Sequence, residues 1–304
     1  MKSTPESALV LTSVTKNYGK SRGISDVSLS VEKGEVFGFL GPNGAGKSTT
    51  INIILDTIRP TSGEIKILGF DNRKDSKKVH SLIGYVSGDM ETDPSLTGKQ
   101  YLAFVANLHG GVKKKTTDDL VARFHCDTSK KIRHLSRGNK QKIGLIAALM
   151  HEPELLILDE PTSGLDPLMQ AEFNDIIKER QQQGKTTFMS SHVLSEVQAT
   201  CHRLGFIRDG KLIVVSTLDQ LVEKASRQIN VMFTKTQPTE ALKQVPGVEN
   251  LTFHNGRHTF DFSGDYSELM QLFGHYQILD LQILEPDLEE LFMDYYESRE
   301  QLNV

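Results

Sequence analysis

The run Gly-Pro-Asn-Gly-Ala-Gly-Lys-Ser-Thr at residues 41–49 matches the pattern G-x-x-x-x-G-K-[ST] of a phosphate-binding loop. Its glycines let the backbone curl so that successive N–H groups point at phosphate oxygens, and a helix beginning near Lys47 adds its positive dipole end. We expect Lys47 to reach the β- and γ-phosphates of a nucleotide, and the Ser48 hydroxyl to bind a Mg²⁺ ion that bridges them. The pattern predicts binding of ATP or GTP. The candidate nucleotide-binding residues of this loop are Gly41, Pro42, Asn43, Gly44, Ala45, Gly46, Lys47, Ser48 and Thr49.

Two carboxylates follow a second apolar run, at residues 154–160. The run predicts a buried parallel strand, and acidic residues at the carboxyl end of such a strand lie at the sheet edge where phosphate loops also lie. Asp159 is expected to hold Mg²⁺ through water opposite Ser48, and Glu160 to activate the attacking water as general base. Two carboxylates that merely cap a helix are disfavoured, because Pro-Thr-Ser-Gly follows at residues 161–164.

Two further side chains are candidates for contacts with a nucleotide. His192 follows a third predicted strand, at residues 186–191, and we expect it at the same sheet edge, within reach of the γ-phosphate. Tyr18 lies in a predicted turn near the phosphate loop. Its ring is either ordinary surface or a platform for a base, and the residues alone leave both open.

These candidates need elements in a fixed order around them. Residues 35–40 are a short, mostly apolar run typical of a buried parallel strand, and residues 49–55 have the apolar spacing of a helix packed on a core. Strand, loop and helix is the order that a phosphate-binding loop requires. Residues 8–38 alternate apolar and polar side chains and predict antiparallel strands, with turns at residues 17–19 and 32–34.

Residues 88–150 differ from what precedes them, because their pattern is helical. We interpret this segment as an inserted helical subdomain. Before it, residues 62–69 favour a hairpin and residues 83–86 a short core strand. Helices are predicted at residues 99–108, 117–124, 141–150 and 169–183, and a hairpin around Asp209-Gly210 at residues 204–215.

A chain of 304 residues is long enough for two domains. After a connecting helix at residues 216–226, residues 228–304 predict the order strand, helix, hairpin, helix, strand, with a last helix at residues 287–296. This is the order of a ferredoxin-like module. The expected fold class is therefore α/β: a phosphate-loop NTPase cassette of residues 1–220, with a mixed sheet core, an antiparallel β subdomain and the helical insertion, followed by a small ferredoxin-like α+β domain.

Composition narrows the class of protein. The net charge is −4, with 35 basic and 39 acidic residues, so nothing indicates a nucleic-acid-binding surface. No apolar run of about 18 residues predicts a membrane span, and the first residues lack the apolar segment of a signal peptide. We therefore expect a soluble, cytosolic chain. Cys126 and Cys201 have no metal-ligand spacing around them and are expected to be reduced structural thiols.

The run Leu-Ser-Arg-Gly-Asn-Lys-Gln-Lys at residues 135–142 resembles the signature sequence of the nucleotide-binding subunits of ATP-binding-cassette (ABC) transporters. The resemblance covers roughly residues 8–216. Phosphate-loop kinases and GTPases lack this signature, and the chain has no guanine-reading Asn-Lys-x-Asp. The resemblance therefore favours ATP, with Mg²⁺, as the ligand.

This resemblance implies a head-to-tail dimer in which each ATP lies between the phosphate loop of one subunit and the signature of the other. Ser136, Gly138 and Asn139 would then face the γ-phosphate across the interface, with the dipole of the helix that they begin. By the same matching, Asp166 belongs to the loop that contacts the partner subunit. The roles implied for the remaining candidates are adenine stacking for Tyr18, the catalytic carboxylate for Glu160 and the switch histidine for His192.

Two departures from the family pattern matter. Arg137 and Asn139 replace a glycine and a glutamine of the signature. Gly88 stands where the family usually has a glutamine that contacts Mg²⁺ and the attacking water. We hypothesise that Asp89, or water alone, fills this gap and that ATP hydrolysis continues at a reduced rate.

The implied function is ATP hydrolysis that powers export through a separate membrane permease, at the cytoplasmic face of the membrane. Residues 287–292 are similar to the tails of exporter ATPases that handle drugs, antibiotics or lipids, and the segment around Gly88 normally carries the groove for a permease helix. A soluble cassette ATPase acting on ribosomes or DNA is the alternative, disfavoured by the single cassette and the short insertion. A third interpretation makes the C-terminal module a sensor or dimerisation domain.

Overall fold

The computed structural model describes residues 6–19, 21–88, 92–224, 226–234 and 237–284. Contacts divide the chain into two compact units, residues 1–218 and residues 219–304, and each is described by itself. The predicted last helix at residues 287–296 and Asp89 lie outside the described residues.

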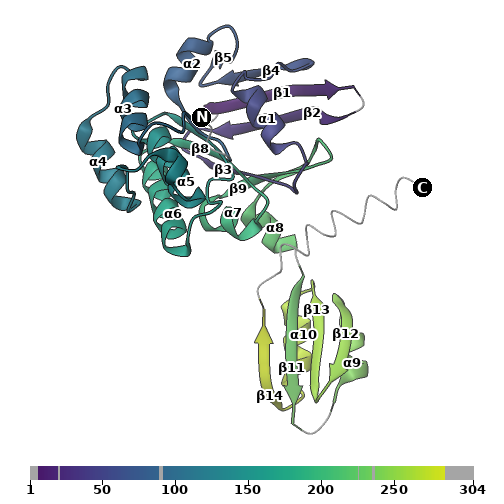
Figure 1. Ribbon diagram of the computed structural model, residues 1–304. Coiled ribbons are helices and arrows are strands. Elements are labelled where there is room, and N and C mark those ends of the chain that lie inside the picture. The colour runs from purple at the N-terminus through teal and green to yellow at the C-terminus, as the bar shows by residue number, and fades with distance from the viewer. Residues whose placement is uncertain (1–5, 20, 89–91, 225, 235–236, 285–304) are drawn as a thin grey trace. The chain divides into compact units, whose positions relative to one another are not determined.

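The core of the first unit is a six-stranded sheet in the order β10-β9-β3-β8-β7-β6 (Figure 1). All neighbours are parallel except β10, which runs antiparallel to β9, so the predicted mixed sheet is confirmed. Every residue of β3, β7 and β8 is buried. The nearly continuous apolar sequences of β3 and β7 suit such burial, whereas β8 also buries two threonines and two serines. The strands are β3 (Val36–Leu40), β6 (Ile83–Val86), β7 (Leu155–Asp159), β8 (Thr186–Ser191), β9 (Arg203–Arg208) and β10 (Lys211–Thr217).

A second, fully antiparallel sheet has the order β2-β1-β4-β5, which confirms the predicted antiparallel strands. Helix α1 (Lys47–Ile54) contacts β7 of the first sheet and β2 of the second. Its Ile51, Ile53 and Ile54 are fully buried in the core that joins the two sheets. The phosphate loop is therefore held between a core strand and a core helix. The strands of the second sheet are β1 (Ser7–Tyr18), β2 (Ser21–Glu32), β4 (Ser62–Ile67) and β5 (Phe70–Asp71).

The remaining helices of the first unit confirm the predicted ones and add two α-helices and the short 3₁₀ helix η1. Helix α5 begins earlier than predicted because the Ser136 hydroxyl caps it. The sequence analysis missed α2 and α7, which have seven residues each and no side-chain cap. The helices are α2 (Ser76–Leu82), α3 (Gly98–Leu108), α4 (Lys114–Arg123), η1 (Ile132–His134), α5 (Arg137–Leu149), α6 (Pro167–Gln182) and α7 (Leu194–Thr200). The predicted connecting helix is α8 (Leu218–Lys224), which begins at the boundary between the two units.

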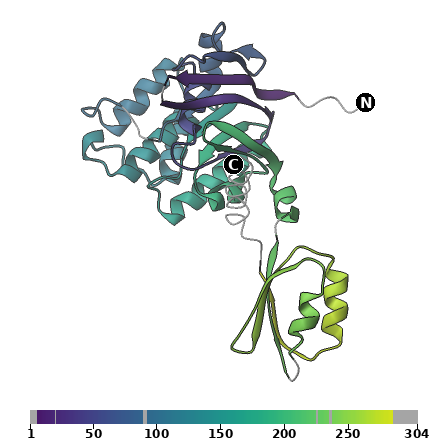
Figure 2. The ribbon, with the colours of Figure 1, turned by 90° about the vertical axis from the view of Figure 1, so that its right-hand side faces the viewer.

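The second unit is an antiparallel sheet in the order β12-β13-β11-β14 with two helices on one face (Figure 2). The predicted order strand, helix, hairpin, helix, strand is confirmed, with the hairpin turning at Asn255 and Gly256. Phe233, Phe260 and Phe273 lie in its separate apolar core. Its elements are β11 (Arg227–Phe233), α9 (Thr239–Lys243), β12 (Val248–His254), β13 (Arg257–Phe262), α10 (Tyr266–Gly274) and β14 (Ile278–Ile283).

Both cysteines are buried free thiols, as predicted. Burial raises the pKa of Cys126 to about 11 and that of Cys201 to about 12, which keeps both protonated near neutral pH. Among the described residues, no helix has both the length and the apolar character needed to cross a bilayer.

Candidate functional site

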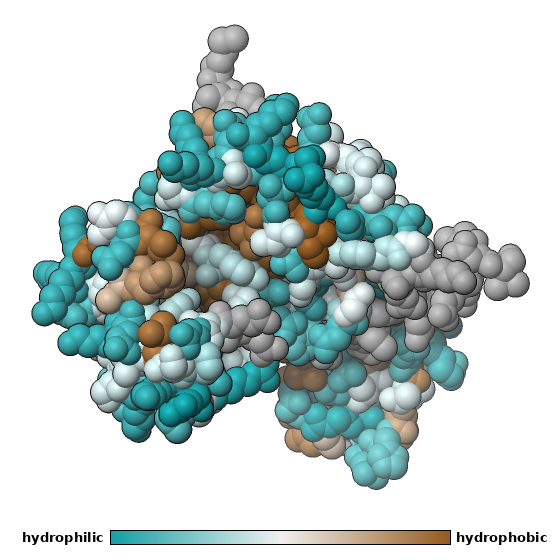
Figure 3. All heavy atoms as spheres, turned by 45° about the horizontal axis from the view of Figure 1, so that its top comes forward, coloured by the Kyte–Doolittle hydropathy of each residue, from teal (hydrophilic) through white to brown (hydrophobic). Residues whose placement is uncertain are grey.

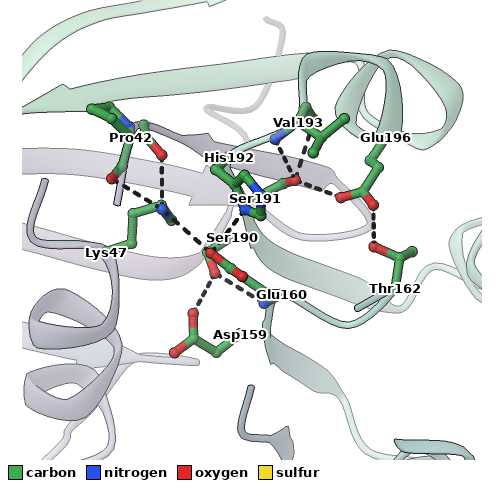
Figure 4. Close-up of polar contacts among 11 residues, drawn as sticks. Pro42, Lys47, Asp159, Glu160, Thr162, Ser190, Ser191, His192, Val193 and Glu196 are labelled. Atoms are coloured by element: carbon green, nitrogen blue, oxygen red, sulfur yellow. Dashed lines mark hydrogen bonds and ion pairs between the residues drawn. The ribbon is translucent and has the colours of Figure 1, made fainter. Parts of the chain in front are cut away.

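Three neighbouring parallel strands deliver the candidate residues to one edge of the six-stranded sheet (Figure 4). The phosphate loop follows β3, Asp159 ends β7 and Glu160 follows it, and His192 follows β8, which lies between β3 and β7. Backbone hydrogen bonds fix the three strand ends: the Gly41 N–H donates to Ser191 O (3.2 Å) and the Glu160 N–H to Ser190 O (3.2 Å). The predicted meeting of these segments is confirmed.

The phosphate loop encloses a hollow of about 290 Å³. Gly46 has φ +109°, and a Cβ there would lie 2.7 Å from Ile24 Cγ2, so only glycine fits. Helix α1 starts directly after it without a side-chain cap, which leaves its first N–H groups for a ligand. The residues lining the hollow are Gly23, Asn43, Gly44, Gly46, Lys47, Ser48, Thr49 and Glu160.

Lys47 is 5% exposed and lies over the loop from which it projects. Its ammonium donates to Gly41 O (2.7 Å) and Pro42 O (3.2 Å), and Nζ is 3.5 Å from Glu160 Oε1. The loop's own carbonyls thus hold the amine in a nearly buried position, beside the carboxylate predicted to be catalytic.

Glu160 contacts functional side chains that follow the other two strands. Its backbone is in the left-handed region at φ +48°, which is unfavourable for a residue other than glycine and turns the chain sharply after β7. Its Oε1 lies 3.1 Å from His192 Nδ1 and 3.5 Å from the Lys47 amine. Asp159, one residue earlier, is buried and accepts a hydrogen bond from the Ser190 hydroxyl. The two adjacent carboxylates therefore have different partners.

The predicted signature residues lie elsewhere in the first unit. Ser136 caps α5, its hydroxyl accepting from the Asn139 N–H (3.3 Å), and Asp166 caps α6 in the same way. Ser136 and Asp166 are exposed. A Cβ on Gly138 would lie 2.4 Å from Gly164 O, so the start of α5 packs closely against the loop that precedes α6. None of the four residues lines the hollow at the phosphate loop of the same chain.

Tyr18 also lies apart from that hollow. Its ring is 42% exposed at the end of β1, with the Lys16 amine 5.1 Å from the ring centroid. Gly23, from the same β1–β2 hairpin, does line the hollow, although the sequence analysis did not select it. A Cβ at this position would lie 1.8 Å from Lys16 O, and a glycine within an alternating strand is the signal that indicates such a close approach.

The sequence analysis also missed the hydroxyl and carboxylate side chains that support the site. Ser190 binds Asp159, while Ser191 and Thr162 both bind Glu196 (Figure 4). Paired serines directly before His192 are a weak signal, and nothing in the sequence pairs Thr162 with Glu196.

Gly88 follows β6 beside the strand that carries Asp159. A Cβ placed there would have Asp159 O at 3.5 Å as its neighbour, which is ordinary van der Waals contact. A side chain at position 88 would therefore start next to the carboxylate-bearing strand, and its Cβ would displace none of the described residues. The hypothesis that Asp89 replaces the missing glutamine falls outside the described residues.

A second hollow, of about 370 Å³, lies between the helical insertion and the core. It is lined by the ends of α1 and α2, by β6 and by one side of α3 and α5. On its wall the rings of His109 and His151 stack at 3.7 Å, and burial lowers the pKa of both. Phe104 and Leu108, which precede the lining residues Val105 and His109 in the sequence, are more than half exposed. Figure 3 shows apolar side chains around a depression on this face.

Comparison with known proteins agrees with these features. A family model described as ABC transporter matches residues 24–163. The linearmycin resistance ATP-binding protein LnrL of Bacillus subtilis is 34% identical over 297 residues, which cover 92% of this chain and 96% of that protein. The bacitracin transport ATP-binding protein BcrA of Bacillus licheniformis is 32% identical over 293 residues, which cover 93% and 95%.

Solved structures support the same fold. The ATP-binding subunit of an ABC transporter matches with a TM-score of 0.66 and 28% identity, over 70% of this chain and 91% of that one. A dimeric bacterial ABC transporter cassette matches with a TM-score of 0.63 and 24% identity, over 69% and 98%. Given relatives above 30% identity that are matched over nearly their full length, the chain belongs to the ABC transporter family, as an ATP-binding subunit that hydrolyses ATP to drive transport.

Proposed function

We propose that this chain powers export of an antibiotic-like compound through a separate permease, as a peripheral subunit at the cytoplasmic face of the membrane. The names of two relatives, which concern bacitracin transport and linearmycin resistance, support this class of cargo. The observation that carries the proposal is the convergence of Lys47, Glu160 and His192 beside the phosphate loop, from three separate strands.

The loop residues 41–49 bind the triphosphate of ATP in this proposal, and Tyr18 stacks on the adenine. Ser48 lines the hollow. Asp159 has a buried carboxylate at the end of β7, which is separated from β3 by β8. Hydroxyl and carboxylate oxygens suit Mg²⁺, so these two residues would hold that ion. When bound, Mg²⁺ neutralises charge on the phosphate oxygens.

Glu160 acts as the general base. Its carboxylate is held by Lys47 and His192, which are also the two side chains that we expect to bind the γ-phosphate. Arrival of the nucleotide gives Lys47 and His192 phosphate oxygens to contact, which frees Glu160 to accept a proton from the attacking water. The same three residues thus bind the nucleotide and make the base available.

A second copy of this subunit, or a close relative, completes the site. Ser136, Gly138 and Asn139 begin α5, and Asp166 begins α6, at positions that do not line the chain's own hollow. We propose that they contact the γ-phosphate and the loop of the partner, where the helix dipole adds to the attraction. ATP then holds the dimer together, and hydrolysis releases it.

The permease is proposed to dock at the hollow between the insertion and the core. Its lining from α3, α5 and β6 and the exposed apolar residues of α3 suit a short apolar helix. Movement of the insertion would then be transmitted to the membrane.

We further propose that residues 1–220 are the ATPase domain, with the helical subdomain at about residues 88–150, and that residues 228–304 are a ferredoxin-like accessory domain. The strand order β12-β13-β11-β14, together with two helices on one face, supports the ferredoxin-like assignment.

The Glu160→Gln variant tests the proposed site. Loss of the base should lower the turnover number about 10²-fold or more while ATP affinity is kept. The unhydrolysed nucleotide should also trap a dimer, which gel filtration in Mg-ATP would detect against a wild-type control. A variant that hydrolyses ATP like the wild type would contradict the proposal. Co-purification with ribosomes or DNA instead of a polytopic membrane protein would favour the alternative function.

A further inference from the structure

Glu196 connects the two loops that carry Glu160 and His192 (Figure 4). It lies in the first turn of α7, and its two carboxylate oxygens accept from different segments. Oε1 accepts from the Thr162 hydroxyl (2.5 Å) and Oε2 from the Ser191 hydroxyl (2.5 Å). Thr162 lies two residues after Glu160, and Ser191 lies directly before His192. One side chain therefore bridges the residues that flank both candidates.

On the side of His192, the bridge orients a turn. The buried Ser191 hydroxyl accepts from the Val193 N–H (2.9 Å) and so closes a turn across His192. It has one hydrogen to donate and two acceptors, Glu196 at 2.5 Å and Val193 O at 3.2 Å. The charged and closer carboxylate takes it. Glu196 thus sets the direction of the hydroxyl that holds this turn.

On the side of Glu160, the bridge holds a strained segment. The left-handed backbone of Glu160 persists only where its surroundings impose it. The next residue, Pro161, has its carbonyl held by the Gln141 amide of α5 (3.0 Å), and Thr162 is 4% exposed and held by Glu196. The loop after Glu160 is therefore fixed from α5 on one side and from α7 on the other.

We propose that Glu196 is a positioning residue for ATP hydrolysis, which keeps the Glu160 carboxylate and the His192 imidazole in a fixed position relative to each other. This inference rests on the proposed roles of Glu160 and His192. Among the described residues, no Lys, Arg or His side chain forms an ion pair with Glu196, so its partners are the two hydroxyls. Its removal leaves the Thr162 hydroxyl without its acceptor, leaves the Ser191 hydroxyl only the more distant Val193 O, and uncouples the two loops.

The test compares steady-state ATP hydrolysis by the full chain with its ATP affinity, for Glu196→Ala, Glu196→Gln and a control. We expect Glu196→Ala to lower kcat about tenfold or more, because even a displacement of about 1 Å can lower a rate about 10²-fold, while KM changes less than threefold. Glu196→Gln should restore most of the rate, since its carbonyl can accept from Thr162 while Ser191 donates to Val193 O. The control is Gln198→Ala, an exposed position on the same helix, and it should behave as the wild type.

A double-mutant cycle sharpens the test. Thr162→Val alone should lower kcat, and it should have no further effect in the Glu196→Ala background, because Thr162 acts through that carboxylate. If Glu196→Ala does not fold, Thr162→Val and Ser191→Ala still report on the bridge, and wild-type rates in both would overturn the proposal.

The remaining outcomes separate the two hypotheses. A wild-type kcat in folded Glu196→Ala, equal losses in the Ala and Gln variants, or additive effects in the cycle would each overturn the positioning role. Full turnover in Glu160→Gln would instead show that the proposed function of the site is wrong. Loss of turnover in Glu160→Gln together with wild-type turnover in Glu196→Ala would remove only the inference about Glu196.

Discussion

At position 88 the backbone has room for a side chain that the sequence does not supply. Among the described residues, a Cβ there meets only Asp159 O, at 3.5 Å. We therefore expect Gly88→Gln to raise the rate of ATP hydrolysis about tenfold, because a side-chain amide near the carboxylates can orient the attacking water. Gly88→Leu is the matched control, since it has similar bulk but no hydrogen-bonding group. Steady-state kinetics would decide, and equal rates in the wild type and the Gln variant would show that the missing amide is immaterial.

Residue types that carry chemistry could be recognised from the sequence for different reasons. Lys47 belongs to the phosphate-loop pattern, Asp159 and Glu160 stand at the end of the apolar run of β7, and His192 follows a predicted strand. Glu196 could not be recognised, since its partner Thr162 is 34 residues away and the two meet only through tertiary packing. The left-handed conformation of Glu160 likewise follows from its surroundings and from no property of glutamate.

At the scale of elements, hydrophobic pattern was sufficient wherever it was long. The continuously apolar strands β3 and β7 and the alternating strands β1 and β2 were predicted to within a few residues, although β3 and β7 have only five residues each. Helices α2 and α7 were missed because seven residues give only two turns of periodicity, and neither has a capping side chain. Their positions come from packing against larger elements.

Strand β13 of the second unit has a titratable core residue. His258 is fully buried against Phe233 and Phe253, and its Nε2 contacts the Thr239 hydroxyl at 2.8 Å. Burial lowers its pKa below the ordinary value of 6.5. The unfolded chain therefore binds more protons between the two pKa values. Stability from this residue is complete above pH 6.5 and falls as pH decreases toward the folded pKa, by at most about 1.4 kcal/mol per pH unit.

Replacing this histidine should remove that dependence. Hydrogen exchange of β13 amides, corrected for intrinsic rates, should show a smaller loss of protection between neutral and acidic pH in His258→Phe than in the wild type. His254→Phe, at an exposed position of β12, is the control and should keep the wild-type dependence. The same slope in all three proteins would mean that His258 does not titrate on unfolding.

At the scale of the whole chain, each unit has a core of its own. The apolar cluster of the cassette draws on residues 9–212, and that of the second unit on residues 229–281. Deleting residues 228–304 should therefore leave a folded cassette that binds ATP with wild-type affinity. If the second unit is a dimerisation or sensor domain, as the third interpretation holds, ATP-dependent dimerisation or hydrolysis should change, and no change in either would contradict it.

In our proposal the permease docks at the hollow between the insertion and the core. A charge on the apolar border of this hollow should therefore weaken binding of the permease and leave ATP affinity unchanged. Leu108 of α3 is 69% exposed, so Leu108→Glu costs the isolated subunit little. Against an apolar permease helix, however, the carboxylate would lose its water, and such burial costs several kcal/mol. Co-purification with the permease should therefore fall about tenfold or more, with ATP affinity unchanged. Ala103→Glu places the same charge at another exposed position of α3 and should co-purify normally, whereas normal recovery of both variants would mean that the permease docks elsewhere.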